Sequence, residues 1–267
     1  MQDSPHASDG PRAVPVNELP FVAPCRPLAV TACAGWLRSG WRDMLTAPGL
    51  SLFYGLLIAL LGASMALVTW RVGLMALYLG LASGFVFIGP FLAVGLYSIS
   101  YQVEQGRSPT LTYSLQQGRA HLRDTLVLGL CLLVVLLVWA RAATLMSVFR
   151  PDAAFPTWRD LLPYLGIGSV VGALFSAIIF AATAFALPML LDRRTDAITA
   201  VVTSINATLR NKAAMTCWAL LIVAAVLLGF ATLFVGFIVL MPLIGHATWH
   251  AYREGIDASA WPSTHQD

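Results

Sequence analysis

The chain has 267 residues, of which 58% are hydrophobic and only 11% are charged, and its mean hydropathy is +0.76. A soluble globular domain carries about 25% charged residues, so this composition excludes an ordinary soluble domain. The formal net charge of +3 comes from 16 basic residues that are spread along the chain. No basic cluster indicates nucleic-acid binding. We therefore expect an all-α, polytopic protein of the lipid bilayer.

The two ends of the chain differ in composition from the rest. Residues 1–27 are rich in proline and polar residues, and they lack the basic start and apolar core of a signal peptide. This composition is typical of a flexible tail. We expect residues 28–256 to form a single membrane domain and residues 257–267 to form a C-terminal tail. The four cysteines contain no CxxC pair, so no disulfide framework is indicated.

Several apolar segments reach the length of about 20 residues that a helix needs to cross a bilayer. The last segment, 213–252, is about twice that length, so we expect it to contain two helices separated near Gly229. A single tilted helix is the alternative, and it would place the C-terminus on the other side. The six predicted membrane helices are 49–69, 73–101, 125–149, 164–191, 213–229 and 231–252.

A short amphipathic segment precedes each odd-numbered membrane helix. In 28–45, 111–126 and 197–209 the apolar residues recur at helical spacing. Such helices are expected to lie in the cytoplasmic interface of the membrane. The pattern predicts three hairpins, each preceded by an interfacial helix, and an internal threefold repeat.

Each even-numbered membrane helix carries one proline near its cytoplasmic half. These prolines are Pro90, Pro188 and Pro242. A proline inside a helix lacks the backbone N–H and clashes with the preceding turn, so each should kink its helix. The spacing between the three units is uneven, which weakens the match between them.

Basic residues are distributed unequally between the two sides of this six-helix arrangement. Ten lie near one set of boundaries: Arg38, Arg42, Arg107, Arg119, Arg123, Arg193, Arg194, Arg210, Lys212 and Arg253. Four lie near the other: Arg71, Arg141, Arg150 and Arg159. Basic residues favour the cytoplasmic side, so the pattern predicts a bacterial inner-membrane protein with both termini in the cytoplasm.

Tryptophans and small residues add two further expectations. Seven tryptophans near predicted helix ends are expected at the membrane–water interface: Trp36, Trp41, Trp70, Trp139, Trp158, Trp218 and Trp249.

Small residues at a spacing of four favour close helix packing, within a compact bundle or between two copies of the chain. They include Gly55, Ala59 and Ala63, then Ala76, Gly80 and Gly84, then Gly168, Gly172 and Ser176.

Three phrases in this order resemble one bacterial family. They are "GPFLAVGLYSISYQVEQG" (89–106), "LPMLLDR" (187–193) and "PLIGHATWHAYREG" (242–255). The chain is similar, from about Trp36 to Ile256, to the predicted integral membrane proteins called domain of unknown function 2189. That family has no assigned reaction, so the resemblance implies no catalytic residues. Some members are labelled as cytochrome c oxidase proteins, which implies respiratory-chain membrane subunits as partners.

His246 and His250 are the first candidate ligands. At a spacing of four they share one helix face, and imidazole commonly binds transition metals and haem iron. One helix cannot supply both axial ligands of a single haem, so another histidine is needed. His121 is expected on the same side and would complete a three-histidine metal site. The alternative is that His246 and His250 are interfacial polar residues beside Trp249, with no cofactor bound.

Three charged residues are further candidates. Asp192 and Arg193 follow Pro188 closely, so they either pair and anchor the helix end or form a gate or substrate contact. Arg141 lies within apolar depth if its helix reaches residue 149, and an intramembrane charge is by default a functional hypothesis. If the spanning part ends near Trp139, Arg141 instead reaches the far interface.

The sequence lacks the common enzyme signatures, including GxSxG, HExxH and the phosphate-binding loop. We therefore expect a non-enzymatic accessory, assembly or scaffold protein of the inner membrane, with no cofactor. The alternatives are a small-solute or ion transporter or channel, and a haem- or metal-binding redox protein.

Overall fold

Most of the residues that the computed structural model describes, which are 20–73, 75–149 and 157–264, lie in helices. The predicted all-α class is confirmed. In chain order the helices are α1 (Ala32–Thr46), α2 (Pro48–Val72), α3 (Met75–Glu104), α4 (Leu111–Ala120), α5 (Leu122–Leu145), the 3-10 turn η2 (Met146–Phe149), α6 (Trp158–Thr183), α7 (Ala186–Asp192), α8 (Ala197–Arg210), α9 (Lys212–Ala231) and α10 (Phe237–Gly255).

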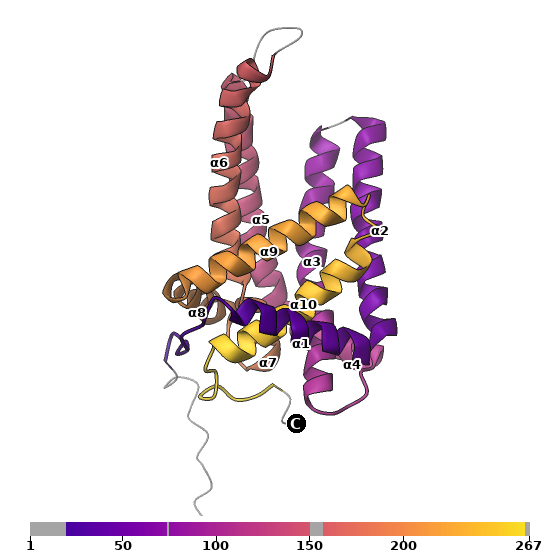
Figure 1. The fold of residues 1–267 in the computed structure, drawn as a ribbon, viewed down its shortest axis with the longest axis vertical. Helices are drawn as coiled ribbons and strands as arrows, with labels where there is room; N and C mark the ends of the chain where they lie inside the picture. The colour runs from indigo at the N-terminus through magenta and orange to yellow at the C-terminus, as the bar shows by residue number, and fades with distance from the viewer. Residues whose placement is uncertain (1–19, 74, 150–156, 265–267) are drawn as a thin grey trace, which may run out of the picture.

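Helices α1, α4 and α8 lie where the sequence predicts amphipathic segments. They lie with α7 at one end of the molecule, the lower part of Figure 1, which we call the basal end. In α8 the small residues Ala200, Ser204 and Ala207 are buried, while Ile198 and Leu209 are exposed. A helix with small residues on the protein and large apolar residues outside is suited to the membrane interface.

Four of the described helical stretches are long and apolar enough to cross a membrane. They are α2, α5, α9 and the stretch Trp158–Asp192 that contains α6 and α7. Figure 1 shows the α2–α3 and α5–α6 pairs as two upright hairpins that rise from the basal end. α10 is not among the four, and about half of its residues are buried inside the protein.

The stretch Trp158–Asp192 is interrupted four residues before Pro188. α6 ends at Thr183 and α7 begins at Ala186. The proline ring excludes the carbonyl of the residue four positions earlier, so the helical hydrogen bonds are broken there. Ser204 of α8 replaces them, because its hydroxyl accepts from the Phe185 N–H at 3.0 Å and donates to the Ala181 carbonyl at 2.7 Å.

The other two prolines lie inside continuous helices, Pro90 in α3 and Pro242 in α10. Pro242 is buried against Gly55 of α2, where a Cβ atom would lie 2.8 Å from the proline ring and would collide with the Ile238 carbonyl. The small residues of α2 therefore pack within the chain. In contrast, a Cβ added at Gly168 or Gly172 of α6 would meet no atom within 4 Å.

A tight turn separates α9 from α10, so the segment 213–252 contains two helices, of which α9 is long and apolar enough to cross a membrane. Leu233 and Phe234 in this turn have positive φ values of 52° and 71°, a region that residues other than glycine rarely adopt. Gly229 allows the ring of Phe237 to approach the end of α9, because any side chain there would collide with it. Figure 1 shows α9 and α10 running obliquely beside the upright hairpins.

The core of the protein lies at the basal end, around α10. Its largest fully buried side chains include Trp36, Trp218 and Trp249. The interfacial prediction is therefore wrong for these three tryptophans, which lie near helix ends but inside the protein. Trp70 and Trp158 are exposed at helix ends, as an interfacial position requires.

Candidate functional site

The last three turns of α10 carry several polar side chains that lie inside the protein or at its edge. His246 is fully buried, and each of its ring nitrogens meets a serine from a different helix. Nε2 lies 2.9 Å from the hydroxyl of Ser51 in α2, and Nδ1 lies 2.8 Å from the hydroxyl of Ser100 in α3. A neutral imidazole has one donor and one acceptor nitrogen, and a hydroxyl can complement either. The two serines therefore satisfy both ring nitrogens of His246.

One turn closer to the basal end, His250 meets a buried carboxylate. Its Nε2 lies 2.8 Å from Oδ2 of Asp43 in α1, whose side chain is only 6% exposed. Asp43 lies on the face of α1 that packs against α10. His246 and His250 thus share a helix face, as predicted, but each has its own partners.

The end of α10 adds a cluster of acidic and basic side chains. Oδ2 of Asp192 accepts hydrogen bonds from the Tyr252 hydroxyl at 2.7 Å, from Arg193 Nε at 2.9 Å and from Arg253 Nη1 at 3.3 Å. Arg253 also donates to Glu104 of α3 through Nη2, at 2.9 Å. Asp192 and Arg193 pair as the anchor interpretation requires, and Arg253 joins them to α3.

Two buried tryptophans extend this network. The Trp249 indole N–H donates to Glu104 Oε2 at 3.0 Å, and the Trp36 indole N–H donates to Glu254 Oε2 at 2.7 Å. A buried indole N–H without an acceptor costs stability, so these carboxylates permit large aromatic side chains in the core. We call the whole set of side chains the α10 network: Trp36, Asp43, Ser51, Ser100, Glu104, Asp192, Arg193, His246, Trp249, His250, Tyr252, Arg253 and Glu254.

The third predicted histidine is not part of the α10 network. His121 lies between α4 and α5, where its Nδ1 is 2.8 Å from the Gln117 carbonyl. Among the described residues, no group of three or more His, Cys, Asp or Glu side chains could hold a metal ion. The structure therefore does not bring His121 together with His246 and His250.

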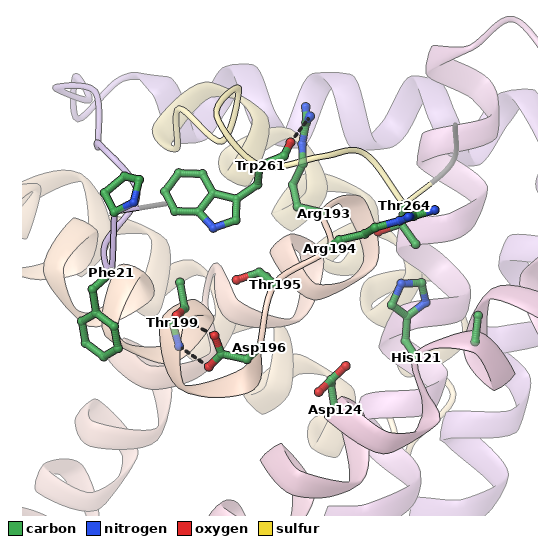
Figure 2. A pocket seen from close by; sticks show the side chains of 12 residues that line it. Phe21, His121, Asp124, Arg193, Arg194, Thr195, Asp196, Thr199, Trp261 and Thr264 are labelled. Atoms are coloured by element: carbon green, nitrogen blue, oxygen red, sulfur yellow. Dashed lines mark hydrogen bonds between the residues drawn. The ribbon is translucent and has the colours of Figure 1, made fainter. Parts of the chain in front are cut away.

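His121 instead lines a cavity at the basal end, with a volume of about 630 Å³. Figure 2 shows Phe21 and Trp261 on one side of it and His121 and Asp124 on another, with Arg193 nearby. The Arg193 guanidinium donates to the Trp261 carbonyl at 3.1 Å, which fixes the C-terminal segment against α7. The cavity has acidic and basic groups in its wall, so its charge does not select one sign of ligand.

Asp196, also in the cavity wall, caps the N-terminus of α8. Burial acts to raise the pKa of Asp196, but hydrogen bonds from Thr199 and from the Ile198 N–H outweigh it and hold the pKa below its usual value. Its Oδ1 accepts the Ile198 and Thr199 N–H groups at 2.9 and 3.0 Å. These groups would otherwise be unsatisfied at the helix start.

Arg141 lies on the exposed surface of α5, outside both the α10 network and the basal cavity. It is 19 residues beyond the start of α5 at Leu122, or about 28 Å along the helix. The hydrocarbon core of a bilayer is about 30 Å thick. This distance fits the interpretation in which Arg141 reaches the far interface.

Sequence reasoning did not identify the partners of the two histidines. Asp43, Ser51 and Ser100 lie 146 to 207 residues from the histidines that they contact. One signal was available for Asp43, because it lies two helical turns after Trp36, on the apolar face of the predicted amphipathic helix. The two serines carry no signal of this kind, since single serines are common in membrane helices.

The comparisons with known proteins agree with this membrane architecture. Neither the curated proteins nor the solved structures give a match to the chain. One family model matches the chain, over residues 77–192. This segment contains the phrase at 89–106 and nearly all of the phrase at 187–193, whereas the phrase at 242–255 lies outside it. Residues 77–192 of this chain match the model of the family described as "Predicted integral membrane protein (DUF2189)", and the resemblance is confirmed over that segment.

Proposed function

We propose that this protein is a non-enzymatic accessory or scaffold protein of a bacterial inner membrane. The observation that carries the proposal is a contrast within the molecule. The polar side chains of the α10 network bind one another and connect α1, α2, α3 and α7 to α10. On α2, α5 and α6, in contrast, many large apolar side chains are exposed. Such a molecule offers helix surfaces to lipid and to other membrane proteins.

The exposed surface of α6 fits a scaffold particularly well. None of its residues is buried, and Val170 and Leu174 are 71% and 59% exposed. Its glycines at 166, 168 and 172 have open space beside them. Small residues let another helix approach closely in lipid. Partners of this kind include a second copy of the chain and, from the family label alone, membrane subunits of a respiratory terminal oxidase.

The proposal includes six membrane crossings in three hairpins, with both termini in the cytoplasm and a threefold repeat of the helix order. α3 and α10 would be the two crossings beyond the four long apolar stretches. The order short helix, long helix, long helix occurs in α1–α3, α4–α6 and α8–α10. Reporter fusions after residues 73, 107, 156, 195, 234 and 257 test the topology. Reporters that lie on alternating sides of the membrane support six crossings. A reporter at 234 that lies on the same side as those at 195 and 257 contradicts them.

The scaffold role is tested by purification of the full chain in a mild detergent, with identification of partners by mass. Gly172→Leu is the test variant, because its side chain would enter open space and would block only a contact with another molecule. Val170→Leu is the matched control at an already bulky, exposed position. Loss of a partner, or of a dimer, in Gly172→Leu alone supports the proposal. A monomer without partners, from membranes of the native host, contradicts it.

Transport of a small solute or ion is the second candidate. It is favoured by the two histidines of α10. His250 is partly exposed, and His246 is fully buried one helical turn deeper in the protein. Two titratable groups in sequence could pass a proton inward. Ion and proton flux into proteoliposomes tests it. Flux that exceeds that of empty vesicles and is lost in His246→Ala would favour transport over the scaffold role.

A further inference from the structure

An apolar groove opens between α6 and α9, above α8. Its volume is about 730 Å³, within the range of about 300–1,000 Å³ that ligand sites have. The groove exists because α9 runs obliquely away from the upright α6 after both have met α8, as Figure 1 shows. The residues that line it are Ala173, Ser176, Ala177, Phe180, Ala181, Thr208, Leu209, Lys212, Met215, Thr216, Ala219, Leu220, Ile222 and Val223.

Small side chains form the two walls of this groove. Ala173, Ala177 and Ala181 follow one another at a spacing of four on α6, and Ala219 faces them from α9. The α9 wall runs from Lys212 to Val223, a rise of about 16 Å along the helix. A long, narrow and apolar space of this kind suits a hydrocarbon chain better than a folded polar ligand.

The groove has one polar end, at the basal end of the molecule. Lys212, the only lysine of the chain, is the first residue of α9 and is exposed there. Within the described part of the chain, no ion pair is formed by this lysine. The Thr208 hydroxyl oxygen is buried nearby and has no hydrogen-bond partner among the described residues. An unpaired cation and an unsatisfied hydroxyl are groups that an anionic ligand would satisfy.

We propose that this groove binds an anionic phospholipid, with one acyl chain between α6 and α9 and the phosphate beside Lys212 and Thr208. The shape and the charge of the groove both suit such a lipid. The apolar walls suit its acyl chain, and the cationic Lys212 lies at the end where the phosphate would be. Basic pockets between membrane helices on the cytoplasmic side are suited to anionic head groups, which are concentrated in that leaflet. The site does not depend on the scaffold role, because a transporter or a redox protein could carry the same lipid.

Native mass spectrometry of the delipidated full chain tests the site, with phosphatidylglycerol and phosphatidylcholine added separately. We expect one phosphatidylglycerol to bind in preference to phosphatidylcholine. Lys212→Gln should weaken phosphatidylglycerol binding about fivefold, which corresponds to the loss of one basic residue near an anionic head group. Arg42→Gln, at an exposed position of α1 away from the groove, is the matched charge control and should have no effect.

The acyl-chain part is tested by filling the groove. Ala177→Phe and Ala219→Phe place a ring in it from opposite walls, whereas Leu174→Phe enlarges an exposed α6 residue outside it. We expect both groove variants to lose the lipid and Leu174→Phe to keep it, with the melting temperature without lipid as the folding control. Retention of phosphatidylglycerol by both groove variants would overturn the proposal. Equal binding of the two lipids, or a wild-type dimer that both groove variants abolish, would overturn it too.

Discussion

Asp43 and His250 are 207 residues apart in the chain and 2.8 Å apart in the structure. This contact joins an interfacial helix to the last helix, and the carboxylate of Asp43 is nearly inaccessible to solvent. Removing His250 leaves the buried Asp43 carboxylate without this partner, whereas removing both side chains does not. Removing Asp43 leaves the His250 ring, which is 27% exposed, in contact with solvent. The effects of substituting the two residues on the stability of the protein should therefore be non-additive.

We expect His250→Ala and Asp43→Ala each to lower the free energy of unfolding by about 1–3 kcal/mol. The double variant should lose less than the sum of the two. Thermal unfolding in a mild detergent measures all three. Additive losses would mean that the two side chains do not interact in the folded protein.

His246 should not be available to bind haem or a transition metal, because Ser51 and Ser100 already contact both ring nitrogens. We expect gently purified protein to lack a Soret band and to contain no stoichiometric transition metal. An absorption spectrum and elemental analysis measure this. A Soret band that disappears in His246→Ala or His250→Ala would instead establish the redox alternative.

Two glycines on different helices provide a matched test of internal packing. At Gly55 a methyl group would collide with the Ile238 carbonyl, whereas at Gly168 it would meet open space. Gly168→Ala should raise stability by up to about 1 kcal/mol through helix propensity. Gly55→Ala should lower it despite the same propensity gain. Equal melting temperatures of the two variants would contradict the close approach of α2 and α10.

The Asp196 cap should make α8 sensitive to acid. Asp196→Ala should cost about 1 kcal/mol, the usual effect of losing such a cap. Because the pKa of Asp196 is lowered in the folded state, its contribution is fully present above its unfolded pKa of about 3.9. The contribution is lost as the pH falls through the lower, folded pKa. The difference in unfolding free energy between wild type and variant should therefore shrink as the pH is lowered below about 3.9, and a difference that stays constant would contradict this.

The sequence was sufficient for the helical elements because each one depends on local patterns. The segments 111–126 and 197–209 have the amphipathic spacing that α4 and α8 show, and the excess length of 213–252 required a turn. The turn lies at 232–236, a few residues after the predicted division near Gly229, which is itself inside α9. Local composition also identified α2, α5 and α9 as long apolar helices.

The candidate site could be predicted only in part. The pattern identified His246 and His250 as members of one helix face, but the partners that decide their chemistry come from three other helices. The same limit explains the wrong prediction for Trp36 and Trp249. An indole at a helix end suits either the interface or a buried carboxylate, and only the packing of α3 and α10 brings Glu104 to Trp249.

The central position of α10 has a consequence for biosynthesis. The serine of α2 that meets His246 is translated 195 residues before it. At about 5–20 residues per second, that interval lasts roughly 10–40 s. Asp43 and Ser51 wait for α10 throughout this time, and Ser100 and Glu104, which are translated later, wait for about 145 residues. In the nascent chain these side chains have to contact water, lipid head groups or the insertion machinery until residues 237–255 arrive, and a premature stop before α10 would leave the earlier helices without the helix that joins them.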